Sequence, residues 1–319
     1  MVRAAVLEAI GQPLAIRHLD LAPPGAGEIK VRMLAAGVCR SDLSVQRGTI
    51  PSFPPVVAGH EGAGVVDEVG EAVDGFSRGD HVVISWIPQC GACGPCRRGR
   101  PHLCEASTLP LLTGGLLDGT PRFTMGGRPV RQLLCAGTFA EATVVPAISA
   151  ARVPATLDPA VAALVGCSVL TGVGAALNTA TIRPGDTVAV IGCGGVGLNV
   201  VQGARIAGAS AVIAVDTRAA NLDLARRLGA TAAVDARAAN PVPAVQSLTA
   251  EQGADVVFEV VGTPSTIDQA MAMTARGGET VLVGIPAIDT TVTIPAFVGL
   301  VLGGRRITGC WYGSADVRR

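Results

Sequence analysis

The sequence predicts an α/β chain of two domains, the first mostly β and the second built on a doubly wound parallel sheet. The length of 319 residues exceeds what a single hydrophobic core usually supports. Hydrophobic residues make up 49% of the chain and charged residues 16%, which excludes a disordered protein. The pattern of apolar runs also changes near the middle of the chain, and this change marks the domain boundary.

The first half, up to about Gly166, has short Val-rich runs separated by Gly, Pro and Asp. Examples are residues 29–35, 64–69 and 81–85. Runs of this length and spacing are typical of an antiparallel β domain with irregular loops.

The second half alternates strand and helix patterns from about Thr187 onward. We expect strands at 187–191, 211–215, 254–260 and 280–283, and helices at 198–207, 222–228 and 266–274. Gly208 and Gly229 follow the first two helices, where glycine is a common terminator. This alternation predicts a parallel sheet with helices on both faces.

Charge and targeting signals restrict the partners and the compartment. The 25 basic and 25 acidic residues cancel, so we expect neither nucleic acid nor an anionic membrane as a partner. Lys30 is the only lysine, which argues against a P-loop and against Schiff-base chemistry elsewhere in the chain. Residues 1–20 include Glu8 and no small-residue cleavage site, so we predict a cytoplasmic protein.

Residues 159–182 carry no charge and are long enough to span a bilayer as a helix. The alternative is a buried connection between the two domains. Small and polar residues favour the connection: Gly166, Ser168, Thr171, Gly172, Gly174 and Asn178.

Four of the nine cysteines form a closely spaced ladder with the pattern C-x2-C-x2-C-x7-C, at Cys90, Cys93, Cys96 and Cys104. Four thiolates on a loop rich in Gly and Pro suit a structural zinc ion. An iron–sulfur cluster also takes four thiolates. A pair of disulfides is the third possibility, although the expected reducing compartment argues against it.

Other potential metal ligands are dispersed: Cys39, His60 and Cys167. Two thiolates, one imidazole and an exchangeable fourth position describe a catalytic zinc site. Each residue alone also has a structural interpretation, and spacing cannot show that the three meet. Cys135, Cys193 and Cys310 are unassigned.

A glycine pattern G-x-G-x-x-G, formed by Gly192, Gly194 and Gly197, follows a predicted strand and opens a predicted helix. Glycines there let the backbone approach a pyrophosphate, which binds the amides at the helix N-terminus. We therefore expect residues 192–197 to bind a dinucleotide, with Gly195 and Val196 included. Asp216 lies nineteen residues after Gly197, where a carboxylate binds the adenosine ribose and disfavours a 2′-phosphate. This favours NAD over NADP.

Together these segments resemble the zinc-dependent alcohol dehydrogenase family of medium-chain dehydrogenases. The resemblance implies a GroES-like catalytic domain (1–168, with a structural zinc lobe at about 90–104) and a Rossmann domain (169–311), with the active site in the cleft between them. It implies that Cys39, His60 and Cys167 bind a catalytic zinc ion, that Cys90, Cys93, Cys96 and Cys104 bind a structural one, and that Glu61 can replace the zinc-bound water.

The resemblance also implies roles for residues around the catalytic zinc. Ser41 would bond the substrate oxygen and pass on its proton, and Asp42 would orient His60. Arg40 would contact the pyrophosphate, while Trp86 and Phe139 would line an apolar substrate pocket. The segment after Cys104, including DGTPRF, is similar to the dimeric branch of alcohol and formaldehyde dehydrogenases, so we expect a homodimer.

The sequence departs from the family pattern in three places. Ser44 stands where many members have the histidine that ends the proton relay. The segment RGTIPSFPPVV lacks the acidic residues that recognise glutathione in the formaldehyde branch. Residues 312–319 would only begin the return to the catalytic domain, so we expect this 319-residue form to bind zinc but to be less stable and less active than a form with the return segment.

These observations predict an NAD- and zinc-dependent dehydrogenase acting on a primary alcohol or its aldehyde. Two alternatives stay open: a thiol-dependent formaldehyde dehydrogenase, and a non-catalytic fragment that binds zinc and NAD.

Overall fold

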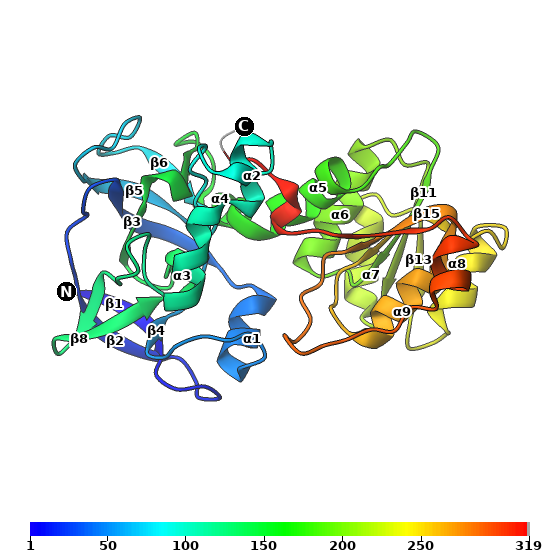
Figure 1. Cartoon of the computed structure of the whole chain (residues 1–319), viewed down its shortest axis with the longest axis horizontal. Helices are drawn as coiled ribbons and strands as arrows, with labels where there is room; N and C mark the ends of the chain where they lie inside the picture. The colour runs from blue at the N-terminus through cyan, green and yellow to red at the C-terminus, as the bar shows by residue number, and fades with distance from the viewer. Residues whose placement is uncertain (318–319) are drawn as a thin grey trace. The chain divides into compact units, whose positions relative to one another are not determined.

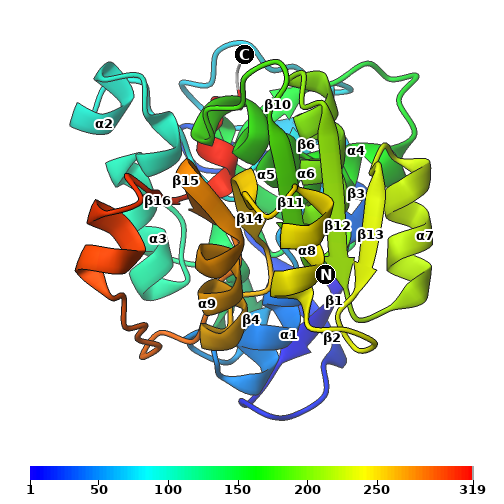
Figure 2. The same ribbon diagram turned by 90° about the vertical axis from the view of Figure 1, so that its right-hand side faces the viewer.

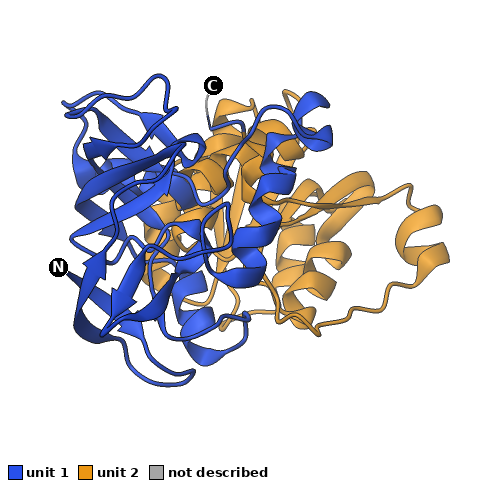
Figure 3. Cartoon of the chain, turned by 60° about the vertical axis from the view of Figure 1, so that its left-hand side comes forward, with its two compact units in different colours: residues 1–167, 316–319 blue, residues 168–315 orange. Residues whose placement is uncertain are grey.

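The computed structural model describes residues 1–317, which form two compact units (Figures 1 and 3). The first unit comprises Met1–Cys167 together with the described residues 316–317, and the second comprises Ser168–Ala315. Of the described residues from 312 onward, where we predict the start of a return to the first domain, 312–315 belong to the second unit and 316–317 to the first.

The first unit is mostly β. Five strands form a closed barrel in the order β1-β2-β7-β8-β4, and five more form a sheet in the order β10-β6-β5-β3-β9. The strands are β1 (Val2–Leu7), β2 (Ala15–Leu21), β3 (Glu28–Gly37), β4 (Val56–Val57), β5 (Glu61–Val69), β6 (His81–Ile84), β7 (Phe123–Met125), β8 (Arg128–Gln132), β9 (Ala142–Pro146) and β10 (Ala150–Arg152). Its helices are α1 (Arg40–Arg47), α2 (Gly94–Arg97), α3 (Thr108–Thr113) and α4 (Pro159–Leu164).

The second unit is a six-stranded parallel sheet in the order β13-β12-β11-β14-β15-β16, visible in Figure 2. The strands are β11 (Thr187–Ile191), β12 (Ala211–Asp216), β13 (Ala232–Asp235), β14 (Ala254–Glu259), β15 (Thr274–Leu282) and β16 (Arg306–Gly309). The helices are α5 (Leu170–Gly174), α6 (Gly195–Ile206), α7 (Ala219–Arg227), α8 (Pro241–Leu248) and α9 (Pro264–Met273).

Alternate residues of the central strands enter two different cores. In β11, Val188 and Val190 pack with α6, whereas Ala189 and Ile191 pack with α8 and α9. A strand that is apolar at every position is thus covered on both faces, as the sequence pattern predicts for a parallel sheet. This confirms the predicted doubly wound α/β architecture.

The uncharged stretch after Asp158 is helical from Pro159 to Thr179, including π-helical turns at Val165–Val169 and Ala175–Thr179. It is long and apolar enough to cross a membrane, but half of its most apolar window is buried. Ala162 and Ala163 pack in a core of the first unit, and Ala175 and Ala176 pack in a core of the second. This packing is typical of a core helix, so the stretch is a half-buried connection, and it is helical throughout with two π-helical turns.

Candidate metal centres and dinucleotide site

The cysteine ladder folds into a compact loop around α2. Hydrogen bonds stabilise its sulfurs: the N–H groups of Ala92 and Cys93 donate to Cys90 Sγ at 3.4 and 3.3 Å, and Cys90 N–H donates to Cys104 Sγ at 3.3 Å. The four sulfurs lie within 4.8 Å of one another. All nine cysteines of the chain are free, which contradicts the disulfide alternative.

The spacing of these sulfurs fits a tetrahedral metal ion. Four thiolates about 2.3 Å from a zinc ion would be separated by about 3.8 Å. Cys93 Sγ and Cys104 Sγ are 3.8 Å apart. Backbone N–H groups of Cys96 and Glu105 lower the pKa of Cys93 to about 6, whereas burial raises the pKa of Cys96 to about 12. Backbone donors thus favour the thiolate form of Cys93, and the loop has the geometry for a structural zinc ion.

The dispersed ligands meet in the first unit. Cys39 immediately precedes α1, His60 lies between β4 and β5, and Cys167 lies in the long apolar helix. Their ligand atoms and a carboxylate oxygen of Glu61 lie within 4.8 Å of one another. The structure thus brings together residues that spacing alone could not connect.

Asp42 orients two members of this group from the first turn of α1. Its Oδ2 accepts a hydrogen bond of 2.9 Å from Cys39 N–H, and its Oδ1 lies 3.2 Å from His60 Nδ1. The side chains of Asp42 and His60 are buried. Because Asp42 engages Nδ1, the other ring nitrogen of His60 is the one available to bind a metal ion.

The ligand atoms of the group also shift one another's pKa values. Hydrogen bonds to Cys167 and then His60 lower the pKa of Cys39 to about 4. Burial opposes the charged imidazole, but hydrogen bonds to Asp42 and Cys39 more than offset it and raise the pKa of His60 to about 10. The hydrogen bond to Cys39, together with burial, raises the pKa of Cys167 well above its usual value. Without a metal ion, the shared protons thus favour a thiolate on Cys39 paired with the His60 ring, and a bound metal ion would have to displace the ring proton.

Glu61, the first residue of β5, completes the group. It is 1% exposed, and burial raises its pKa to about 7. Within the described part of the chain its Oε2 has no hydrogen-bond partner. Gly37 faces Glu61 across β3 and β5, and a Cβ at Gly37 would overlap Oε2. A buried oxygen that lacks a partner is what a carboxylate kept beside a metal ion would show.

The remaining predicted site residues of the first unit have different surroundings. Ser41 is half-buried and Arg40 is exposed, both in the first turn of α1. Trp86 contacts the ring of His60 edge-on, with 6.4 Å between ring centres and an angle of 87°.

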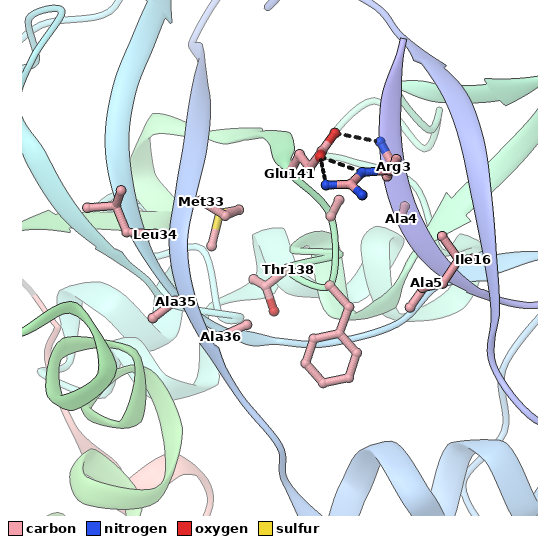
Figure 4. Close-up of a pocket in the computed structure, with 12 residues that line it drawn as sticks. Arg3, Ala4, Ala5, Ile16, Met33, Leu34, Ala35, Ala36, Thr138 and Glu141 are labelled. Carbon is pink, nitrogen blue, oxygen red and sulfur yellow. Dashed lines mark hydrogen bonds and ion pairs between the residues drawn. The ribbon is translucent and has the colours of Figure 1, made fainter.

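Phe139 instead packs on Gly59 and lines a separate cavity of about 460 Å³, whose lining includes Arg3, Met33 and Glu141 (Figure 4). Arg3 and Glu141 form an ion pair there at 2.6 Å. None of the predicted metal ligands lines this cavity. The geometry therefore supports Trp86 as a neighbour of the metal group, whereas Phe139 as a residue of the substrate pocket stays a prediction.

The glycine pattern connects β11 to α6 in the second unit. Gly192 has a φ of 91°, which favours glycine, and a Cβ at Gly197 would overlap the carbonyl oxygen of Gly192. Gly194 precedes the first turn of α6, whose free N–H groups can bind a phosphate. The loop therefore has the backbone geometry for a pyrophosphate.

Asp216 ends β12, next to this loop. Its carboxylate accepts hydrogen bonds from the N–H groups of Cys193 and Arg218 at 2.7 and 2.8 Å, and from Asn221 Nδ2 at 3.2 Å. These bonds fix a negative charge at the carboxyl end of β12, where the adenosine ribose of a dinucleotide binds in this type of sheet.

Comparisons with known proteins agree with this geometry. Residues 25–155 match the model of the alcohol dehydrogenase GroES-like domain, and residues 195–319 match that of the zinc-binding dehydrogenases. An S-(hydroxymethyl)glutathione dehydrogenase from Synechocystis is 39% identical over 99% of this chain and 86% of the relative.

Two solved structures share the fold over nearly the whole chain. A benzyl alcohol dehydrogenase from Acinetobacter calcoaceticus superposes with a TM-score of 0.92 at 29% identity, over 100% of this chain and 86% of that one. A zinc-binding dehydrogenase from Sinorhizobium meliloti, solved bound to NADP, has a TM-score of 0.80 at 32% identity, over 98% of this chain and 84% of that one.

Proposed function

The chain belongs to the zinc-dependent alcohol dehydrogenase family, and we propose that it oxidises a primary alcohol to the aldehyde, or catalyses the reverse reduction, with NAD as the hydride carrier. The observation that carries this proposal is the meeting of Cys39, His60 and Cys167 with a carboxylate oxygen of Glu61. Two sulfurs and one imidazole leave a fourth position open, which distinguishes a catalytic zinc site from the four-sulfur structural site.

The overall reaction converts an alcohol and NAD⁺ into an aldehyde, NADH and a proton. When bound, zinc supplies a Lewis acid for the alcohol oxygen, and NAD accepts the two electrons and the hydrogen as hydride. Asp42 keeps His60 in the ligand orientation and keeps Cys39 at the start of α1. Glu61 provides a carboxylate whose pKa of about 7 allows it to change protonation near neutral pH.

We assign to Ser41 the role of accepting the hydroxyl proton of the alcohol and passing it on. It follows Cys39 by two positions, at the start of α1, and is half-buried. Ser44, one turn further along α1, cannot store a proton at neutral pH. We therefore propose that the proton passes from Ser41 to solvent through water, without a histidine in the relay.

An apolar primary alcohol is the substrate class that the site favours. Trp86 is 6% exposed and places an aromatic surface against His60. The similarity to a benzyl alcohol dehydrogenase supports the same class.

The second candidate substrate is the adduct of formaldehyde with a thiol, which the name of the Synechocystis relative favours. A panel that compares benzyl and simple primary alcohols with S-hydroxymethylglutathione would separate the two. Faster turnover of the thiol adduct than of every alcohol would contradict our assignment.

The choice of NAD over NADP follows from Asp216. A carboxylate fixed by three hydrogen bonds repels a 2′-phosphate. We further propose that the enzyme works in the cytoplasm as a homodimer. Light scattering of the purified protein would test the dimer.

The decisive test is an alcohol panel with NAD or NADP, before and after removal of metal by a chelator. We expect NADH formation that disappears on chelation and returns with zinc. NADH binding without oxidation of any alcohol would instead support a non-catalytic zinc- and NAD-binding protein.

A further inference from the structure

Glu259 is a buried carboxylate of the second unit, at the carboxyl end of the parallel sheet. It ends β14 and is 0% exposed. Its Oε1 accepts three hydrogen bonds, from the N–H groups of Val261 and Gly262 at 2.9 and 2.8 Å and from the Thr266 hydroxyl at 2.7 Å. Among the described residues, its Oε2 has no partner. One oxygen atom therefore holds the turn between β14 and α9 in place.

This turn, residues 260–263, lies against the glycine loop. Val260 N–H donates to the carbonyl oxygen of Ile191 at 2.9 Å, directly before Gly192. A Cβ on Gly192 would come within 2.6 Å of a methyl group of Val261. Any shift of the turn would therefore change the space around the first glycine of the pattern.

The position of the turn in the sheet indicates which part of a dinucleotide it affects. β11 and β14 are neighbours in the middle of the sheet (Figure 2), and the strand order reverses between them. Ligands of such sheets bind outside the carboxyl ends of the strands at this switch point. Asp216 marks the adenosine side, on β12, so the other half of a dinucleotide extends over β14.

We propose that Glu259 is a positioning residue for the nicotinamide half of the cofactor, acting through the turn 260–263; this rests on the proposed NAD-dependent function. The alternative is a purely structural role. A buried carboxylate with one unpartnered oxygen is a costly way to stabilise a strand, and replacing such groups by apolar residues is often neutral or stabilising. The arrangement is more readily explained by the need for one acceptor atom that fixes three donors of the turn.

The test compares binding of NADH with binding of AMP, which contains only the adenosine half of the cofactor, in full-length protein. We expect Glu259→Ala, which removes the acceptor of all three hydrogen bonds, to raise the Kd for NADH about tenfold, or about 1.4 kcal/mol. The Kd for AMP should change less than twofold. Glu259→Gln keeps an oxygen acceptor for the turn and should restore most of the NADH affinity.

Glu279 provides a matched control in the adjacent strand. It is also buried, at 4% exposure, and accepts hydrogen bonds from the Thr308 hydroxyl and from Thr181 N–H. It pairs with Val256, well before the carboxyl end of the sheet. Glu279→Gln should therefore lower the melting temperature without changing either Kd. If Glu259→Ala does not fold, Thr266→Val removes one of the three donors and should raise the Kd for NADH alone, by two- to threefold.

Three outcomes would overturn the inference. Equal weakening of NADH and AMP by Glu259→Ala would show a general structural role. Unchanged NADH affinity in Glu259→Ala, or in Thr266→Val where the former does not fold, would show that the turn does not position the cofactor. The third outcome is failure of the unsubstituted protein to bind NADH while it still binds AMP. This result would reject the proposed function itself. It is distinguishable from the first two outcomes because it is measured on the protein without any substitution.

Discussion

The two metal groups of the first unit are built in opposite ways. The four cysteines of the lobe come from fifteen consecutive residues, 90–104, and local turns bring their sulfurs together. Cys39, His60 and Cys167 span 129 positions of the sequence and meet only because α1, the β4–β5 connection and the apolar helix converge. A local group depends on its own loop, whereas a dispersed group depends on the packing of the whole unit.

This difference predicts different consequences when each group is disturbed. Loss of the metal ion from the lobe should mainly lower the free energy of unfolding. The dispersed group has an open ligand position, so disturbing it should mainly lower the rate of turnover.

The largest expected effect is on turnover. Cys167→Ser should lower kcat/KM at least ~10³-fold, because Lewis-acid stabilisation is worth several kcal/mol and each 1.4 kcal/mol is tenfold. Metal analysis should show one zinc ion per chain in place of two. Retained activity with one zinc ion would contradict the assignment of the catalytic ligands.

The next effect is on stability. Cys96→Ser should lower the free energy of unfolding by about 4 kcal/mol or more, the range in which loss of a structural metal lies. Denaturant unfolding of this variant and of Cys167→Ser would measure the difference between the two groups. A larger loss of stability in Cys167→Ser than in Cys96→Ser would contradict the expectation that the lobe contributes more to stability than the dispersed group.

Zinc affinity of the dispersed group should depend steeply on pH. In the metal-free protein the raised pKa values keep protons on His60 up to about pH 10 and on Cys167 above its usual range, while Cys39 is ionised above about pH 4. Zinc therefore displaces about two protons between pH 6 and 9, and its affinity should fall roughly 100-fold for each unit by which the pH is lowered.

Competition with a chelator across this pH range would measure that slope. In Cys39→Ser the lobe is the remaining zinc site, so subtracting the binding curve of this variant gives the zinc affinity of the dispersed group. Release of fewer than one proton per bound zinc ion would show that the His60 ring and the Cys167 thiol are not both protonated in the metal-free protein.

The smallest effect concerns Asp42. Asp42→Asn should weaken zinc binding at the dispersed group by about 10- to 100-fold, the usual cost of losing a carboxylate that orients a ligating histidine. Arg47→Ala, an exposed change in the same helix, should leave the affinity unchanged. The lobe should keep its zinc ion in both variants.

The sequence predicted most of the second unit because its elements are long and regularly patterned. The strand at 187–191 and the one beginning at 211 were confirmed almost to the residue, and α6 begins at Gly195, three residues before the predicted start. β13, α8 and β16 were not predicted. β13 has only four residues, and Pro241 and Pro243 in α8 weaken its helical pattern, so packing against the sheet decides these elements.

The same distinction holds for the functional residues. The ladder and the glycine loop are short-range patterns, and their chemistry follows from residue type and spacing. The pairing of Asp42 with both Cys39 and His60, the need for glycine at Gly37 and the turn held by Glu259 depend on contacts across strands and helices. A carboxylate ending the apolar run ADVVFE was the one visible signal for Glu259.

By itself the sequence determined the fold class, the four-sulfur loop and the loop for a dinucleotide, because each is encoded by neighbouring residues whose backbone and donor atoms act together. Only the tertiary structure decided that two distant sulfurs and one imidazole share a space with a carboxylate oxygen of Glu61. The physical reason is that such a space, and the pKa values within it, are created by burial and by charges that approach one another only when the chain has folded.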